Sequence, residues 1–159
     1  MSNLIGIINY GIAGNIFSVK KALEKAGGNV FIINKPADFE RADKIVIPGV
    51  GSFKDAMEEL GKDEFIEPIK SYEKPILGIC LGFQIMMNSS EEDSGVRCLG
   101  LLDGTTKYIK DKNTHNGWED FKIDTREVKH NAFFPKKSTK KVDGRVYFNH
   151  ELMVELVED

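Results

Sequence analysis

The feature that most constrains the fold is a short strand pattern that runs directly into a helical pattern, with a cysteine at the junction. Residues 74–84 read KPILGICLGFQ. The apolar run 76–79 follows a proline, as expected of a buried strand in a parallel sheet, and residues 81–87 then switch to helical spacing. Cys80 stands where the period changes. The segment therefore predicts a strand, a sharp corner and a helix.

Two glycines make this corner a candidate catalytic site. Gly78 and Gly82 flank Cys80 at two residues on each side, which is the spacing of a nucleophile elbow with sulfur in place of a serine hydroxyl. Such an elbow holds its nucleophile in a strained backbone, and side chains at the flanking positions would collide with the neighbouring strand or helix. The free N–H groups at the start of the helix favour a thiolate. The alternative is that Cys80 is a small buried apolar residue, but the paired glycines favour a nucleophile.

Length and composition exclude several classes of protein. A length of 159 residues is typical of a single domain. The net charge of −3 gives no excess of basic residues with which to bind nucleic acid. No apolar stretch approaches the roughly 20 residues of a membrane span, and the first residues do not resemble a signal peptide. Cys80 and Cys98 show neither zinc-ligand nor disulfide spacing. We expect one cytoplasmic domain, 1–159, without metal or cofactor and without a nucleic acid or membrane partner.

The first half of the chain alternates between strand and helix patterns. Expected strands cover 4–9, 30–34, 44–48 and 76–79, and expected helices cover 16–26, 53–60 and 65–69. This alternation predicts right-handed βαβ units in a mostly parallel sheet. The glycine loop at 10–15 lacks the lysine of a P-loop, so a tight turn is favoured there over a phosphate site.

The second half has a different character. The polar run 88–95 predicts a solvated surface loop, and the basic run 136–141 predicts another, with partner docking as the lesser alternative for the basic run. Short strands are expected at 105–110, 121–123 and 145–149, with antiparallel pairing.

Several motifs together resemble the class I glutamine amidotransferases. The elbow GICLGFQ at 78–84 is preceded by PGVGSF at 48–53, and both match that family. The segments INYGIAGN at 8–15, HNGW at 115–118 and YFNH at 147–150 narrow the resemblance to the HisH glutaminase subunits of imidazole glycerol phosphate synthase. The resemblance covers nearly the whole chain. It implies a flavodoxin-like α/β fold, with a mostly parallel sheet and helices on both faces.

The resemblance also implies roles for particular residues. Cys80 is the nucleophile that attacks the carboxamide of glutamine and forms a thioester with release of ammonia. Backbone N–H groups of Leu81 and of the turn Gly49-Val50-Gly51 are the matching oxyanion donors. Gln84 helps to recognise the substrate, although it could also be an ordinary helix residue. The implied partner is a HisF-like (β/α)8-barrel cyclase, or another synthase that accepts ammonia.

One departure from the family limits these expectations. Family members carry a general acid–base histidine and its carboxylate in a Phe-His-Pro-Glu motif, which these 159 residues lack. Of His115, His130 and His150, none matches the catalytic position. The apolar pattern of residues 151–159 favours a truncated C-terminus, so we expect poor glutamine hydrolysis by this chain. Two alternatives stay open: a glutaminase that serves a sugar-modifying amidotransferase of surface polysaccharide synthesis, and a non-catalytic scaffold of the same fold.

Overall fold

The computed structural model describes residues 3–11, 16–110, 114–124 and 141–157. The chain forms two compact units. The first unit comprises residues 1–108 and 153–159, and the second comprises residues 109–152. The first unit contains the predicted elbow, and the two units are described separately below.

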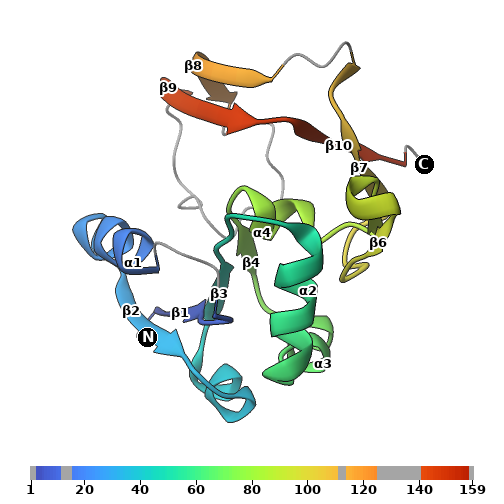
Figure 1. Ribbon diagram of the computed structural model, residues 1–159. Coiled ribbons are helices and arrows are strands. Elements are labelled where there is room, and N and C mark those ends of the chain that lie inside the picture. The colour runs from blue at the N-terminus through green and yellow to red at the C-terminus, as the bar shows by residue number, and fades with distance from the viewer. Residues whose placement is uncertain (1–2, 12–15, 111–113, 125–140, 158–159) are drawn as a thin grey trace. The chain divides into compact units, whose positions relative to one another are not determined.

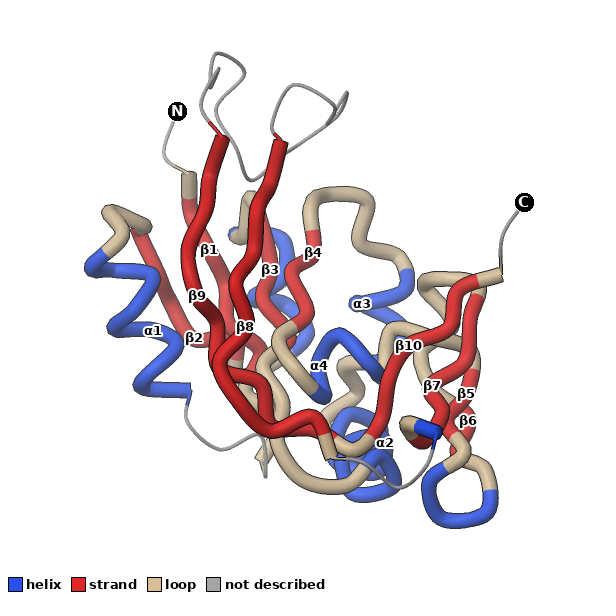
Figure 2. Tube along the Cα trace, turned by 90° about the horizontal axis from the view of Figure 1, so that it is seen from above, coloured by secondary structure: helices blue, strands red, loops and turns tan. Residues whose placement is uncertain are grey.

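The centre of the first unit is a four-stranded parallel sheet in the order β2-β1-β3-β4. Its strands are β1 (Leu4–Ile8), β2 (Asn29–Ile33), β3 (Lys44–Ile47) and β4 (Ile76–Gly78). Figure 2 shows these four strands side by side. Each lies within one residue of its predicted bounds, so the predicted parallel α/β architecture is confirmed.

Helices cover both faces of this sheet. They are α1 (Ile16–Lys25), α2 (Phe53–Lys62), α3 (Ile66–Lys70) and α4 (Leu81–Gln84), with a 3-10 helix η1 (Pro36–Arg41). Because parallel crossovers are right-handed, the connections from β1 to β2 and from β3 to β4, which run in opposite directions across the sheet, pack on opposite faces. Figure 1 accordingly shows α1 on one side of the strands and α2 and α3 on the other.

Local sequence explains where the helices begin and end. Gly27 has φ +89° at the end of α1, and the N–H of Gly28 donates to the carbonyl of Leu23 at 2.9 Å. This is the Schellman arrangement, which favours glycine at the left-handed position. Ser52 begins α2, since its Oγ accepts from the N–H of Asp55 at 3.2 Å.

The core forms where the strands meet α2 and α3. Branched side chains of the strands and the apolar face of α2 exclude water, as period-2 and helical patterning predict. The residues with 1% exposure or less include Ile7, Ile8, Ile33, Ile45, Ile47, Phe53, Leu60, Phe65 and Ile69.

A second small sheet replaces the loop predicted at 88–95. Its order is β10-β7-β5-β6, built from β5 (Ser89–Ser90), β6 (Val96–Arg97), β7 (Gly104–Tyr108) and β10 (Leu152–Leu156), with a 3-10 helix η2 (Glu92–Ser94) between β5 and β6. The prediction of a solvated segment holds at Asn88, Glu91, Ser94 and Gly95, which are exposed, but it is wrong at Ser90, which lies in β5 and is only 2% exposed.

The polar residues of this sheet are buried because their hydroxyls find partners. Ser90 Oγ accepts from the N–H of Glu92 at 3.1 Å, and Thr106 Oγ1 donates to the carbonyl of Gln84 at 3.2 Å. A buried hydroxyl that is hydrogen-bonded carries little penalty. The polar composition of residues 88–95 therefore gave no indication that Ser90 is buried.

Helix α4 is shorter than predicted. The helical pattern extends to Met87, but α4 ends at Gln84. The carbonyls of Ile85, Met86 and Met87 accept instead from the N–H groups of residues 99–102, at 2.8–3.0 Å. These long-range bonds take the acceptors that another helical turn would need.

The second unit is built on one antiparallel pair, β8 (His115–Asp124) and β9 (Lys141–His150). Both are longer than the strands predicted at 121–123 and 145–149. The motif at 115–118 consequently lies on β8. The basic run predicted as a loop lies almost wholly outside the described residues.

In the described ranges, no helix has both the length and the apolar character needed to cross a membrane.

Candidate functional site

The backbone at Cys80 is strained, as the elbow pattern predicts. Cys80 follows β4 and precedes α4, with φ 53° and ψ −118°. Non-glycine residues rarely adopt positive φ, and strain of this kind persists only where the surrounding structure enforces it. The Cys80 residue is exposed. Cys80 therefore lies accessible to solvent at the carboxyl end of β4, and ligands of open α/β sheets bind at the carboxyl ends of the strands.

Close packing of three glycines enforces this corner. A Cβ on Gly82 would lie 1.9 Å from the carbonyl oxygen of Ile47, and one on Gly78 would lie 2.4 Å from Cα of Phe83. A Cβ on Gly49 would lie 2.5 Å from the backbone nitrogen of Gly82. The expectation that side chains cannot be accommodated beside Cys80 is thus confirmed at both flanking glycines.

The same contacts bring a second segment to the elbow. Residues 48–52, here called the PGVGS loop, join β3 to α2 and pass beside the start of α4 (Figure 1). Gly51 has φ +99°, a value that favours glycine. In the described ranges, no acceptor pairs with the N–H groups of Gly49, Val50, Gly51 or Leu81. Leu81 follows Cys80 in the sequence and Gly49 packs against Gly82, so these two donors lie at the elbow, and Val50 and Gly51 continue the same loop.

Two side chains distant in sequence hold the PGVGS loop at its ends. The hydroxyl of Tyr10 donates to the carbonyl of Pro48 at 2.5 Å, and a carboxylate oxygen of Glu92 accepts from the N–H of Phe53 at 2.7 Å. Neither residue was predicted to contact this loop, although Tyr10 lies in the segment 8–15 that carries part of the family resemblance. Their contacts join positions 38 and 39 residues apart, so no local pattern could reveal them.

The two cysteines differ in burial, since Cys80 is exposed and Cys98 is buried. Burial raises the pKa of the Cys98 thiol to about 11, with a further contribution from Glu92, so Cys98 stays protonated at neutral pH. Its Sγ donates to the carbonyl of Val96 at 3.5 Å. Burial, followed by the negative charge of Cys80, raises the pKa of Tyr10, so this phenol stays neutral and remains a donor. Exposure and location thus distinguish Cys80 as the candidate nucleophile.

Gln84 lies one helical turn after Cys80 and is 9% exposed. Its N–H donates to the carbonyl of Cys80 at 3.1 Å, and its own carbonyl accepts from Thr106. Its backbone therefore ties the elbow to the small sheet through β7.

The histidines do not belong to the unit that holds Cys80. The chain has three histidines, and all three fall within residues 109–152. Nδ1 of His115 lies 3.0 Å from Nε2 of His150, and the ring of His115 stacks on Phe148 at 4.7 Å. Nδ1 of His150 also donates to the carbonyl of Leu152 at 2.6 Å. His130 lies outside the described residues.

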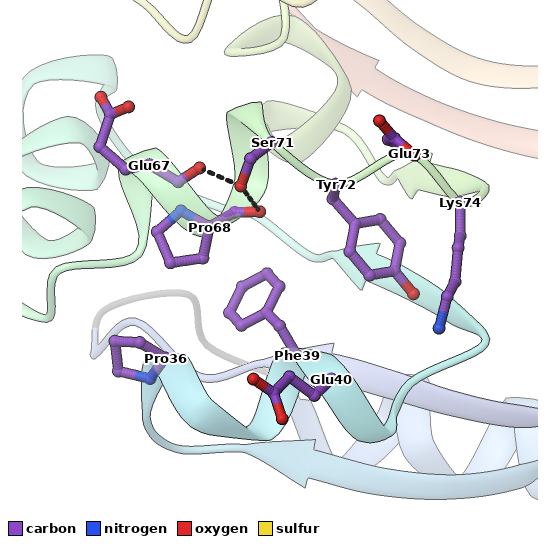
Figure 3. Close-up of a pocket in the computed structure, with 9 residues that line it drawn as sticks. All are labelled: Pro36, Phe39, Glu40, Glu67, Pro68, Ser71, Tyr72, Glu73 and Lys74. Atoms are coloured by element: carbon purple, nitrogen blue, oxygen red, sulfur yellow. Dashed lines mark hydrogen bonds between the residues drawn. The ribbon is translucent and has the colours of Figure 1, made fainter.

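The first unit also has a cavity of about 570 Å³ away from the elbow (Figure 3). It is lined by Pro36, Phe39, Glu40, Glu67, Pro68, Ser71, Tyr72, Glu73 and Lys74. Tyr72 and Lys74 both donate to the carbonyl of Ala42, at 2.9 and 2.7 Å. These residues precede β3 and β4, whereas Cys80 follows β4, so the cavity lies toward the opposite end of the sheet.

Comparison with known proteins gives consistent matches. The family described as "Glutamine amidotransferase class-I" matches residues 7–159. The imidazole glycerol phosphate synthase subunit HisH of Bacillus licheniformis is 38% identical over 167 residues, which cover 98% of this chain and 74% of that protein. The subunit HisH 1 of Campylobacter jejuni is 35% identical over 176 residues, covering 98% of this chain and 87% of that protein.

Solved structures agree at the level of the fold. A crystal structure described as a glutamine amidotransferase aligns with a TM-score of 0.63 at 12% identity, covering 90% of this chain and 70% of the other. A glutamine amidotransferase from Thermotoga maritima aligns with a TM-score of 0.57 at 16% identity, and the alignment covers 98% of this chain and 64% of that protein.

Proposed function

The chain belongs to the class I glutamine amidotransferase family, and on this basis we propose that it is the cytoplasmic glutaminase subunit of an imidazole glycerol phosphate synthase. In this role it converts glutamine to glutamate and ammonia for histidine biosynthesis. The observation that carries the proposal is the exposed, strained Cys80 beside free backbone donors, in a chain 38% identical to HisH. The proposed partner is a HisF-type cyclase subunit that accepts the ammonia.

The proposed reaction begins at Cys80. Its thiolate attacks the carboxamide carbon of glutamine, which forms a C–S bond and places the negative charge on oxygen. The N–H groups of Leu81 and of residues 49–51 stabilise that oxyanion, and Gln84 contributes to the substrate site. Cleavage of the C–N bond, with a proton transferred to nitrogen, releases ammonia and leaves a thioester. Water then attacks the thioester, which yields glutamate and restores the thiol.

Release of ammonia needs a proton on the leaving nitrogen, which a general acid supplies. Residues 1–108 contain no histidine, so Cys80 is the nucleophile of this proposal and no histidine is assigned as the acid. General acid–base groups typically contribute about 10²–10⁴-fold to such steps. We expect turnover that depends on Cys80.

Glutamate release in the presence of a HisF-type cyclase subunit tests the function. We expect glutamine-dependent release that is lost in Cys80→Ala and retained in Cys98→Ala. Cys98 serves as the matched control because it is the other free cysteine and is buried. Release that survives Cys80→Ala, or no release in any condition, would contradict the proposal.

A further inference from the structure

The hydroxyl of Tyr10 connects the end of β1 to the start of the PGVGS loop. Tyr10 is 1% exposed, and its hydroxyl donates to the buried carbonyl of Pro48. Tyr10 follows β1 directly, at the same end of the sheet as Cys80. The phenol therefore reaches from one strand end to the next beside the candidate nucleophile.

The geometry of the peptide bond gives this contact a consequence for Gly49. The carbonyl of Pro48 and the N–H of Gly49 belong to one planar peptide unit, in which they point in opposite directions. A hydrogen bond that fixes the carbonyl oxygen thus fixes the direction of the N–H. Gly49 and Gly51 give the loop little intrinsic stiffness, because glycine populates both signs of φ. The direction of this donor must therefore be set by a contact from outside the loop.

We propose that Tyr10 is a positioning residue, whose hydroxyl holds the Pro48–Gly49 peptide so that the loop donors face the oxyanion formed at Cys80. The inference rests on the proposed glutaminase function. At the far end, the bond from Phe53 to Glu92 anchors the same loop, and at the near end the Tyr10 hydroxyl bonds the carbonyl of its first peptide. Without the phenol, the buried Pro48 carbonyl lacks a donor and the peptide turns toward water.

Tyr10→Phe tests this role because it removes one oxygen and leaves the ring. Tyr72→Phe is the matched control, since Tyr72 also donates from its hydroxyl to a backbone carbonyl, that of Ala42, before β3. The substrate is γ-glutamyl hydroxamate, whose leaving group, hydroxylamine, is a weaker base than ammonia and needs less help from an acid. Thioester formation at Cys80 is followed by rapid quench and intact-protein mass spectrometry. Alkylation of Cys80 by iodoacetamide, which passes through no oxyanion, is followed in parallel.

We expect Tyr10→Phe to lower the saturating rate of thioester formation by about 10- to 100-fold, somewhat less than the loss of a whole oxyanion donor. The half-saturating hydroxamate concentration and the iodoacetamide rate should stay within about twofold, because substrate binding and thiol reactivity are unchanged. Tyr72→Phe should leave all three quantities within about twofold.

Three results would overturn the inference alone: an unchanged saturating rate in Tyr10→Phe, an equal loss of the iodoacetamide rate, or the same loss in Tyr72→Phe. A Tyr10→Phe chain that no longer folds would also overturn it, since the hydroxyl would then support the whole unit. Failure of the wild-type chain to form any thioester, with normal alkylation of Cys80, would overturn the proposed function as well.

Discussion

At the scale of single residues, the site depends on backbone positions that only certain residues tolerate. Cys80 occupies φ 53°, where a side chain costs about 1–2 kcal/mol relative to glycine. At Gly49, Gly78 and Gly82 the neighbouring backbone atoms are too close to leave room for a Cβ. The strain at the nucleophile is thus balanced by packing around it, and both can be measured by substitution.

Cys80→Gly should be more stable than Cys80→Ala. Both variants lack the thiol, but only glycine relieves the left-handed strain, and its greater unfolded-state entropy offsets about 0.4–1 kcal/mol of that gain. We expect a net difference of about 1 kcal/mol in the free energy of unfolding, measured by urea denaturation. An alanine variant as stable as the glycine variant would show that the corner is not strained.

Gly82→Ala and Gly61→Ala should change stability in opposite directions. The new Cβ at position 82 would lie 1.9 Å from the Ile47 carbonyl, so the strand or helix must shift, at a cost of at least about 2 kcal/mol. At position 61, inside α2, the nearest atom is the Ile66 methyl at 3.7 Å, and alanine favours the helix by about 1 kcal/mol. The test is the urea concentration at the midpoint of unfolding, measured for the wild type and both variants. A Gly82→Ala chain as stable as the wild type would contradict the packing around Gly82.

The residues that sequence reasoning found are those with a local signature. Cys80, Gly78 and Gly82 were identified because their spacing is itself the signal, whereas Gln84 was assigned a role only through the family resemblance. Glu92 was missed because it lies in a polar run whose composition indicates only solvation, and its bond to Phe53 is non-local. The roles of Cys80, Gln84 and the donors remain proposals.

At the scale of elements, the four strands of the parallel sheet, which follow apolar patterns, were predicted well, and β5, which has no such pattern, was missed. β1 to β4 combine branched apolar residues with burial, so pattern and structure agree. β5 is a pair of serines, and its burial depends on partners that only the folded chain supplies. The length of α4 was likewise set by the segment 99–102, which takes its carbonyls.

Helix α2 carries the PGVGS loop at its start, and its cap can be tested alone. Ser52→Ala removes the acceptor for the N–H of Asp55 and should cost about 1 kcal/mol of unfolding free energy. Ser52→Gly should cost only a few tenths of a kcal/mol, since glycine is also accepted at this position. Equal losses in thermal denaturation of the two variants would argue that Ser52 does not cap the helix.

At the scale of the whole molecule, buried phenols make stability depend on alkaline pH. Burial, with a smaller contribution from the charge of Asp43, raises the pKa of Tyr72 from 10.0 to about 12. Burial also raises the pKa of Tyr10. A folded-state pKa above the unfolded value means that the folded chain retains a proton which the unfolded chain releases. The corresponding stability is fully present below pH 10 and is lost as the pH rises toward about 12.

We therefore expect the free energy of unfolding to fall between pH 10 and about 12, with a shallower slope in Tyr72→Phe. Urea titrations at a series of fixed pH values give the free energy of unfolding of the wild type and of Tyr72→Phe. The difference between them removes the pH dependence that both share, such as that of the lysines. Identical slopes in the wild type and the variant would contradict the assignment to Tyr72.

The central claim is that Cys80 is a nucleophile in a site shaped for glutamine. Its most direct test is covalent labelling of the 159-residue chain by a diazoketone analogue of glutamine, with the modified residue located by peptide mass spectrometry. We predict one label, on Cys80, which excess glutamine suppresses and which Cys98 does not share. No label on Cys80, or labelling that glutamine does not slow, would contradict the claim and favour a non-catalytic scaffold.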